Sequence, residues 1–169
     1  IRWDSTFLLD DSITYEEACM FEPMGAGVHG VESAQVEGKT VLVSGCGPIG
    51  LTAVAASKTF GAKIVIACDL IDSRLQDALD MGADVVLNSG KCDLPEEIRK
   101  LTDGIGADAA IDVTGAAPAI RNSLRSVRAA GRLVCVGLPG KPVELDLTND
   151  LIYREVEMTG ISGRKIWET

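Results

Sequence analysis

Three glycines, Gly45, Gly47 and Gly50, follow the apolar run 41–43 and precede an alanine-rich stretch. The spacing Gly-x-Gly-x-x-Gly between a predicted strand and a predicted helix is typical of a loop that binds the pyrophosphate of a dinucleotide. The first glycine allows a tight turn, the second lets the backbone approach the phosphates, and the third lets helix and strand pack closely. The helix, beginning at Pro48, would offer free N–H groups and the positive end of its dipole. The alternative is a glycine-rich turn in another kind of α/β domain.

Asp69 supplies the second part of the pattern. It directly follows the apolar run 62–68, roughly twenty residues after the loop, where an acid can accept hydrogen bonds from the adenosine ribose. A carboxylate there opposes the 2′-phosphate of NADP, so the sequence favours NAD. Arg74 weakens this preference because an arginine can accommodate that phosphate; it can equally be a solvated helix residue. Asp69 has one alternative role, as the cap of a helix that starts near Ile71.

The amino-acid composition of the chain limits the kinds of partner that it can bind. The chain has 169 residues, a hydrophobic content of 46% and a net charge of −9 at pH 7. The charge argues against nucleic acid or an anionic membrane as a partner, and no apolar run reaches the length of a membrane span. Five scattered cysteines indicate reduced thiols in a cytoplasmic protein, and no metal site is expected within the chain. The single histidine, His29, is expected to be a packed structural residue.

Strand-like and helix-like segments alternate along the chain, which predicts an α/β fold with a doubly wound parallel sheet, the Rossmann fold. About six strands in the order 3-2-1-4-5-6 are expected, with helices on both faces. The expected strands are 40–44, 62–68, 84–87, 107–113, 131–137 and about 155–161, and the expected helices are 48–60, 72–81, 94–102 and 116–129. Glycines 61, 82, 106 and 131 stand where left-handed residues are needed after helices. An earlier helix should start at Thr14 and run on, past Pro23, to Val36.

The sequence neighbours of two further residues, Thr114 and Glu22, suggest functional roles for them. Thr114 follows the fourth predicted strand, at the sheet edge where this fold binds its cofactor, although it can equally be the N-cap of the next helix. Glu22 has apolar neighbours and precedes Pro23, which favours breaking the helix. An acid in such company is either half-buried with a raised pKa or turned to an opening.

Glu22-Pro23, the segment Gly27-Val28-His29 and the glycine loop together resemble the medium-chain zinc-dependent alcohol dehydrogenases. The tail 160–169 is similar to the Gly-Ile-x-Gly-Arg-x-x-Trp/Phe-Glu-Thr segment of their L-threonine 3-dehydrogenase branch, where polyol dehydrogenases diverge. The resemblance covers essentially the whole chain but only the coenzyme-binding half of that family's subunit. It implies a connecting segment at 1–38 and a dinucleotide-binding domain at 39–169. The domain with the family's zinc ligands would precede Ile1 and a returning segment would follow Thr169, so the chain is expected to be truncated at both ends.

The resemblance also assigns roles to residues. It places Ile49 near the pyrophosphate and nicotinamide ribose, Asp69 and Arg74 at the adenosine ribose, and Glu22 near the catalytic zinc as a proton-relay acid. The backbone near the nicotinamide would come from the two segments Val136-Gly137-Leu138 and Ile161-Ser162.

The implied activity is oxidation of the threonine hydroxyl with NAD as cofactor, in a complete enzyme whose zinc lies outside this chain; the fragment alone is expected to be inactive. The alternatives are a polyol (sorbitol-type) dehydrogenase and a non-catalytic module for NAD(H) binding or assembly. The implied partners are NAD(H), a small alcohol and a second copy. The second copy would join through the last strand into a homodimer, with a tetramer possible in the complete protein.

Overall fold

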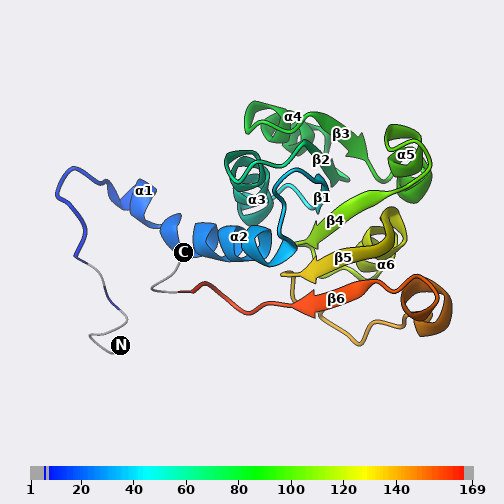
Figure 1. The fold of residues 1–169 in the computed structure, drawn as a ribbon. Helices are drawn as coiled ribbons and strands as arrows, with labels where there is room; N and C mark the ends of the chain where they lie inside the picture. Colours follow the sequence, from blue (N-terminus) through cyan, green and yellow to red (C-terminus); the bar gives the residue numbers. More distant parts are fainter. Residues whose placement is uncertain (1–5, 7, 166–169) are drawn as a thin grey trace.

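A six-stranded parallel sheet forms the centre of the protein (Figure 1), in a computed structural model that describes residues 6 and 8–165. The strand order is β3-β2-β1-β4-β5-β6, and every neighbouring pair is parallel. The strands are β1 (Thr40–Ser44), β2 (Ile64–Asp69), β3 (Val85–Asn88), β4 (Ala107–Asp112), β5 (Val127–Cys135) and β6 (Glu157–Gly160). The expected fold class and strand order are confirmed.

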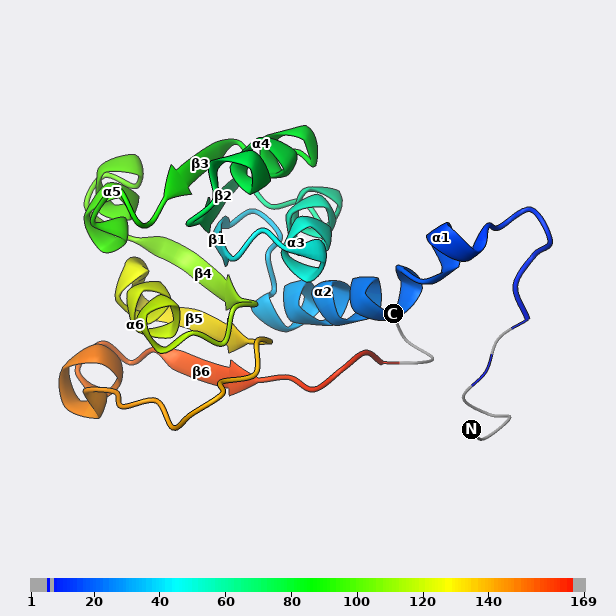
Figure 2. The same cartoon turned by 180° about the vertical axis from the view of Figure 1, so that it is seen from behind.

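Helices cover both faces of the sheet (Figure 2). On one face lie α2 (Phe21–Ala34), α3 (Pro48–Thr59) and α4 (Asp72–Asp80), whose apolar side chains share a core with Val41, Val43 and Val65. On the other face, α5 (Leu94–Leu101) and α6 (Ala117–Ser126) pack on Leu42, Ile66 and Leu133. Within a strand, neighbouring side chains point to opposite faces, so a strand buried on both sides is continuously apolar.

The chain enters this domain through two helices. Thr14 caps α1 (Tyr15–Ala18): its hydroxyl accepts the N–H of Glu17, whose carboxylate accepts the N–H of Thr14 at 2.9 Å. The expected single helix is in fact two, and the second begins at Phe21. Pro23 does not break α2, because it lies in the first turn, where a missing N–H costs no helical hydrogen bond. The helix ends before Val36, since Gln35 adopts φ 53°.

Three of the four expected left-handed glycines are confirmed, with φ of +82° at Gly61, +100° at Gly82 and +99° at Gly106. Gly131 is not left-handed; the preceding Ala130 is, with φ 52°. A Cβ at position 131 would lie 2.8 Å from the carbonyl oxygen of Arg128, so close packing excludes a side chain there. The fifth strand begins earlier than expected, at Val127, and contains both Ala130 and Gly131.

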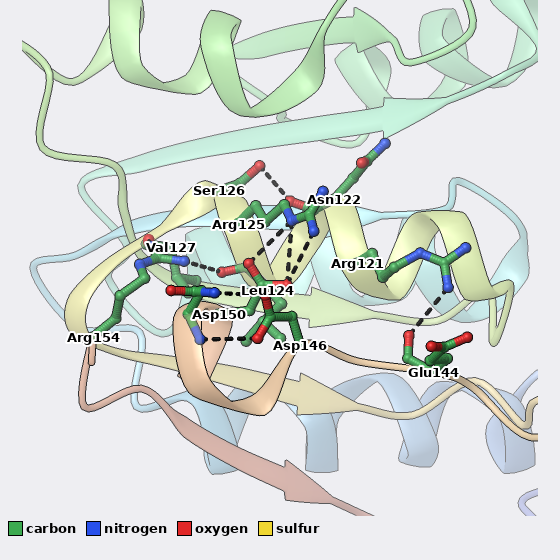
Figure 3. Close-up of polar contacts among 11 residues, drawn as sticks. Arg121, Asn122, Leu124, Arg125, Ser126, Val127, Glu144, Asp146, Asp150 and Arg154 are labelled. Atoms are coloured by element: carbon green, nitrogen blue, oxygen red, sulfur yellow. Dashed lines mark hydrogen bonds and ion pairs between the residues drawn. The ribbon is translucent and has the colours of Figure 1, made fainter. Parts of the chain in front are cut away.

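A π-helical turn, Leu147–Ile152, joins β5 to β6 and was not expected from the sequence. Figure 3 shows how α6 holds it: Arg125 Nε lies 3.1 Å from Asp150 Oδ1 in an ion pair. Arg154 donates to the carbonyls of Leu124 and Val127, at the end of α6. These contacts fix the position of β6 at the edge of the sheet.

No helix in the described part of the chain combines the length and the apolar character needed to cross a membrane.

Candidate functional site

The strand order of the sheet has its switch point between β1 and β4. β2 and β3 extend the sheet to one side of β1, and β4 to β6 extend it to the other. In parallel α/β sheets this switch point opens a crevice beyond the carboxyl ends of the strands, where ligands bind. The strands meet there closely: Gly45 N donates to Cys68 O at 2.8 Å and Val113 N donates to Ser44 O at 3.0 Å.

The glycine loop has the backbone geometry that phosphate binding requires. Gly45 adopts φ +98°, a conformation that favours glycine. A Cβ on Gly50 would lie 1.8 Å from the carbonyl oxygen of Gly45, so only glycine lets α3 pack this close to the turn. Gly47 differs from both: a Cβ there would meet nothing within 4 Å. The space before Gly47 and the N-terminus of α3 is therefore open to a ligand.

Asp69 ends β2 and braces this loop. Its Oδ2 accepts the N–H of Cys46 at 2.8 Å, and its Oδ1 accepts those of Leu70 at 2.7 Å and Ile71 at 3.0 Å. The capping alternative is wrong, because the N-cap of α4 is Ile71 and no side chain caps it. A carboxylate offers about four acceptor positions. Backbone N–H groups use three of them, so one position remains for a ligand hydroxyl on Oδ2, which Arg74 Nη1 faces from 3.9 Å.

Two cavities flank Asp69. One of about 310 Å³ runs between β2, α5 and α6 and has the mainly apolar lining Leu70, Leu94, Ala116, Pro118 and Ala119. The other, of about 320 Å³, lies along the glycine loop and includes Gly47, Pro48, Ile49 and Gly50. Both are lined by Gly45, Asp69, Arg74 and Thr114. Because they share these four residues, the two cavities form one groove with an apolar end and an end along the glycine loop, beside the N-terminus of α3.

Arg74 and Thr114 both line that groove. Arg74 Nη1 lies 3.9 Å from Asp69 Oδ2, and its side chain is half-exposed. Thr114 donates its hydroxyl to Asp112 Oδ1 at 2.8 Å and accepts the N–H of Ala116 at 3.0 Å. It is not the N-cap of α6, which is Ala116.

Asp112 is a site residue that the sequence reasoning missed. It ends β4, is fully buried, and its Oδ2 accepts the N–H of Gly115 at 3.0 Å. Burial raises the pKa of its carboxyl group. Its backbone carbonyl accepts the N–H groups of Val136 at 2.8 Å and Gly137 at 3.0 Å. Asp112 therefore joins the loops that follow β4 and β5; an acid ending an alanine-rich strand was the available signal.

The segments expected near the nicotinamide lie at the carboxyl ends of β5 and β6. Gly137 packs on the loop after β4, since a Cβ there would lie 2.1 Å from Gly115 N. Leu138 is 88% exposed. Ile161 continues the ladder by donating its N–H to Cys135 O at 3.0 Å, and Ser162 is exposed. The fold brings Val136–Leu138 beside Thr114 and Ile161 beside the end of β5. Unlike Thr114, the residues Val136–Leu138, Ile161 and Ser162 line neither of the two cavities described above.

Glu22 lies in the first turn of α2 and is exposed. The half-buried alternative is therefore wrong, and Glu22 lines neither part of the groove. Its role in proton relay stays a prediction. Of the tail that carried part of the family resemblance, residues 166–169 lie outside the described residues.

Zinc does not fit the described part of the chain, which contains no group of three or more His, Cys, Asp or Glu side chains placed to hold a metal ion. Burial raises the pKa of Cys46 and of Cys68 to about 12, and that of Cys135 to about 11. These thiols are neutral near pH 7, whereas a metal ligand is a thiolate.

Known proteins resemble this chain in sequence. A profile of the zinc-binding dehydrogenase family matches residues 48–169. The L-threonine 3-dehydrogenase of Symbiobacterium thermophilum is 42% identical over 160 residues, which are 95% of this chain and 46% of that protein. The sorbitol dehydrogenase of Bacillus subtilis is 39% identical over 165 residues, again 95% and 46%. The chain thus spans about half the length of the curated relatives it matches.

Solved structures resemble it in fold. The 2R,3R-butanediol dehydrogenase of Bacillus subtilis superimposes with a TM-score of 0.83 at 35% identity, covering 95% of this chain and 46% of that one. A protein of Sinorhizobium meliloti 1021, solved with NADP bound, gives a TM-score of 0.85 at 27% identity, covering 94% and 47%.

Proposed function

This chain belongs to the zinc-binding dehydrogenase family, and on that premise we propose that it is the coenzyme-binding domain of an NAD-dependent L-threonine 3-dehydrogenase. The observation that carries the proposal is the groove at the switch point, with its apolar end, its single free acceptor on Asp69 and its open space before Gly47. These features match the adenine, ribose and pyrophosphate of a dinucleotide in that order.

The residues of this chain bind and orient the cofactor. The adenine occupies the apolar end, a ribose hydroxyl donates to Asp69, and the N–H groups at the start of α3 receive the pyrophosphate. By the two-fold repetition of this fold, the nicotinamide half lies over the ends of β4, β5 and β6. The backbone of Val136–Leu138 and Ile161–Ser162 orients it there. When bound, NAD accepts the hydride that leaves the substrate carbon.

NAD is proposed over NADP because the Asp69 carboxylate is fixed by three backbone N–H groups and cannot turn away from a 2′-phosphate. Arg74 offers a phosphate only a half-exposed guanidinium that already faces Asp69. A related structure does bind NADP, so the preference rests on these two residues of this chain.

L-Threonine is proposed as the substrate because of the names of the relatives and because of the sequence that follows β6. L-Threonine 3-dehydrogenases are among the relatives, at 42% identity in one case, and the segment Gly160–Arg164 has the pattern expected of that branch. Sorbitol is the competing substrate, because a sorbitol dehydrogenase is 39% identical. In the complete protein, Glu22 would relay the substrate proton from its exposed place on α2.

A homodimer through β6 is proposed because all four residues of this edge strand are exposed. Ile161 N points to β5, so by alternation the N–H groups of Met158 and Gly160 point outward. Met158→Pro should remove an outward donor while sparing the ladder to β5 and should shift the mass measured by light scattering towards that of a monomer. A mass that is monomeric already in the unaltered protein would refute the dimer.

Cytoplasmic localisation is proposed from the thiols. All five cysteines are free, and Cys46 and Cys68 are buried. Such a set suits a reducing compartment.

The test of cofactor binding is calorimetric titration of the Gly47→Val variant with NADH. The open surroundings of Gly47 leave room for the valine in the free protein, so its melting temperature should stay near that of the parent while NADH binding is lost. Gly140→Val is the matched control, since Gly140 also has open surroundings but lies outside the groove. Undiminished NADH binding by Gly47→Val would overturn the proposed phosphate site.

A further inference from the structure

Helix α2 and the segment that follows β6 lie side by side, as both Figure 1 and Figure 2 show. Three contacts join them. His29 Nδ1 lies 3.0 Å from Gly163 O, Glu32 Oε2 lies 3.6 Å from Lys165 Nζ, and Arg164 packs over Gly25. These partners are more than a hundred residues apart in sequence, so the contacts are tertiary.

Two glycines, Gly25 and Gly163, allow the two segments to lie this close together. A Cβ on Gly25 would lie 2.6 Å from the Cβ of Arg164, so a glycine is needed for the helix to approach the segment. Gly163 adopts φ +60°, a conformation that favours glycine, and the chain bends at this residue. Because a carbonyl only accepts hydrogen bonds, His29 must carry its proton on Nδ1.

The residues held in this way adjoin the proposed nicotinamide position. Ile161 is bonded to the end of β5 and Ser162 is exposed, and Gly163 follows directly. His29 lies outside both cavities of the adenosine half of the groove. Its contact lies next to Ile161–Ser162 and outside the adenosine half of the groove.

We propose that His29 is a positioning residue for the nicotinamide half of the cofactor: its Nδ1–H holds the carbonyl of Gly163 and so fixes the backbone of Ile161–Ser162 against the nicotinamide. The proposal rests on the proposed function, since it requires that the groove binds a dinucleotide. It assigns no contact between the imidazole and the cofactor itself.

The experiment compares NADH with ADP-ribose, which lacks the nicotinamide, by calorimetry on the parent, His29→Leu and His29→Asn. Leucine removes the donor, whereas the amide nitrogen of asparagine stands close to the place of Nδ1. His29→Leu should weaken NADH binding about three- to tenfold, the effect of one hydrogen bond, and leave ADP-ribose binding unchanged. His29→Asn should restore most of the NADH affinity. A purely structural role would weaken both ligands together.

A second measurement does not depend on any variant folding. His29 is the only histidine in the chain, so its imidazole ¹⁵N signals in the parent protein are unambiguous. They should show a protonated Nδ1 and should move with NADH but not with ADP-ribose. Equal responses to the two ligands, or equal weakening of both in His29→Leu, would overturn the inference while leaving dinucleotide binding intact. A parent that binds neither ligand would overturn the proposed function first.

Discussion

Replacing Asp69 by asparagine should narrow the preference for NADH over NADPH by about thirtyfold or more, or about 2 kcal/mol. Asp69 has one acceptor position left for a ribose hydroxyl, because three backbone N–H groups occupy the others. Loss of the charged Oδ2 removes the acceptor of the ribose hydroxyl, because the amide oxygen keeps the place of Oδ1 beside Leu70 and Ile71 and the amide nitrogen takes that of Oδ2; this costs NADH about 1 kcal/mol or more. It also relieves NADPH of a like-charge repulsion of about 1–4 kcal/mol at a separation of about 4 Å.

The assay is calorimetric titration with each cofactor at fixed ionic strength, with the ratio of the two dissociation constants as the observable. The ratio is chosen because Asp69 also braces the glycine loop through Cys46, and damage to that loop weakens both cofactors alike. Asp72→Asn is the matched control: Asp72 is exposed, binds Asn88 and Lys91, and lines neither cavity.

Two results would refute this reasoning. One is a ratio in Asp69→Asn that stays within about threefold of the parent ratio, below what the loss of one charge should produce. The other is an equal change in Asp72→Asn, which would indicate a general effect of net charge. A parent that binds NADPH as tightly as NADH would shift the discriminating role to Arg74.

Three further predictions concern stability and reactivity. Gly50→Ala should lower the free energy of unfolding in urea by about 1–3 kcal/mol or more, because its Cβ would stand 1.8 Å from Gly45 O; an unchanged midpoint would contradict the close packing. Asp112→Ala should cost about 1–3 kcal/mol by leaving the buried N–H of Gly115 unpaired, and unaltered stability would remove its bracing role. At pH 8, iodoacetamide should modify exposed Cys19 well before Cys46 and Cys68, whose pKa burial raises to about 12; equal rates by mass spectrometry would contradict that burial.

The strands and their order could be predicted because the signals are local. Apolar runs such as 41–43 and 64–68 are bounded by polar residues, and the loop from Gly45 to Gly50 identifies the first βα unit. The left-handed residue in β5 was misplaced by one position, since both Ala130 and Gly131 lie in the irregular part of this strand, between Val127 and Arg132. There the packing against Arg128 O, and not the backbone angle, requires the glycine.

What the sequence did not reveal depends on distant contacts. The π-helical turn is held by the ion pair of Arg125 and Asp150, which are twenty-five residues apart. No local sequence pattern predicts that pair. The third hydrogen bond to Asp69, from Cys46, likewise joins two segments that only the fold brings together. The apolar neighbours of Glu22 left two alternatives open, half-burial or an orientation toward an opening, and only its place in the first turn of α2 shows that it is exposed.

The most direct measurement of the central claim is the set of backbone amide shifts in ¹⁵N-labelled protein titrated with ADP-ribose and with NADH. Binding in the groove should move the amides of Cys46, Gly47 and Leu70 with both ligands, and those of Ile161 and Ser162 with NADH alone. Shifts confined to other surfaces, or no shifts at saturating NADH, would contradict the assignment of this groove as the dinucleotide site.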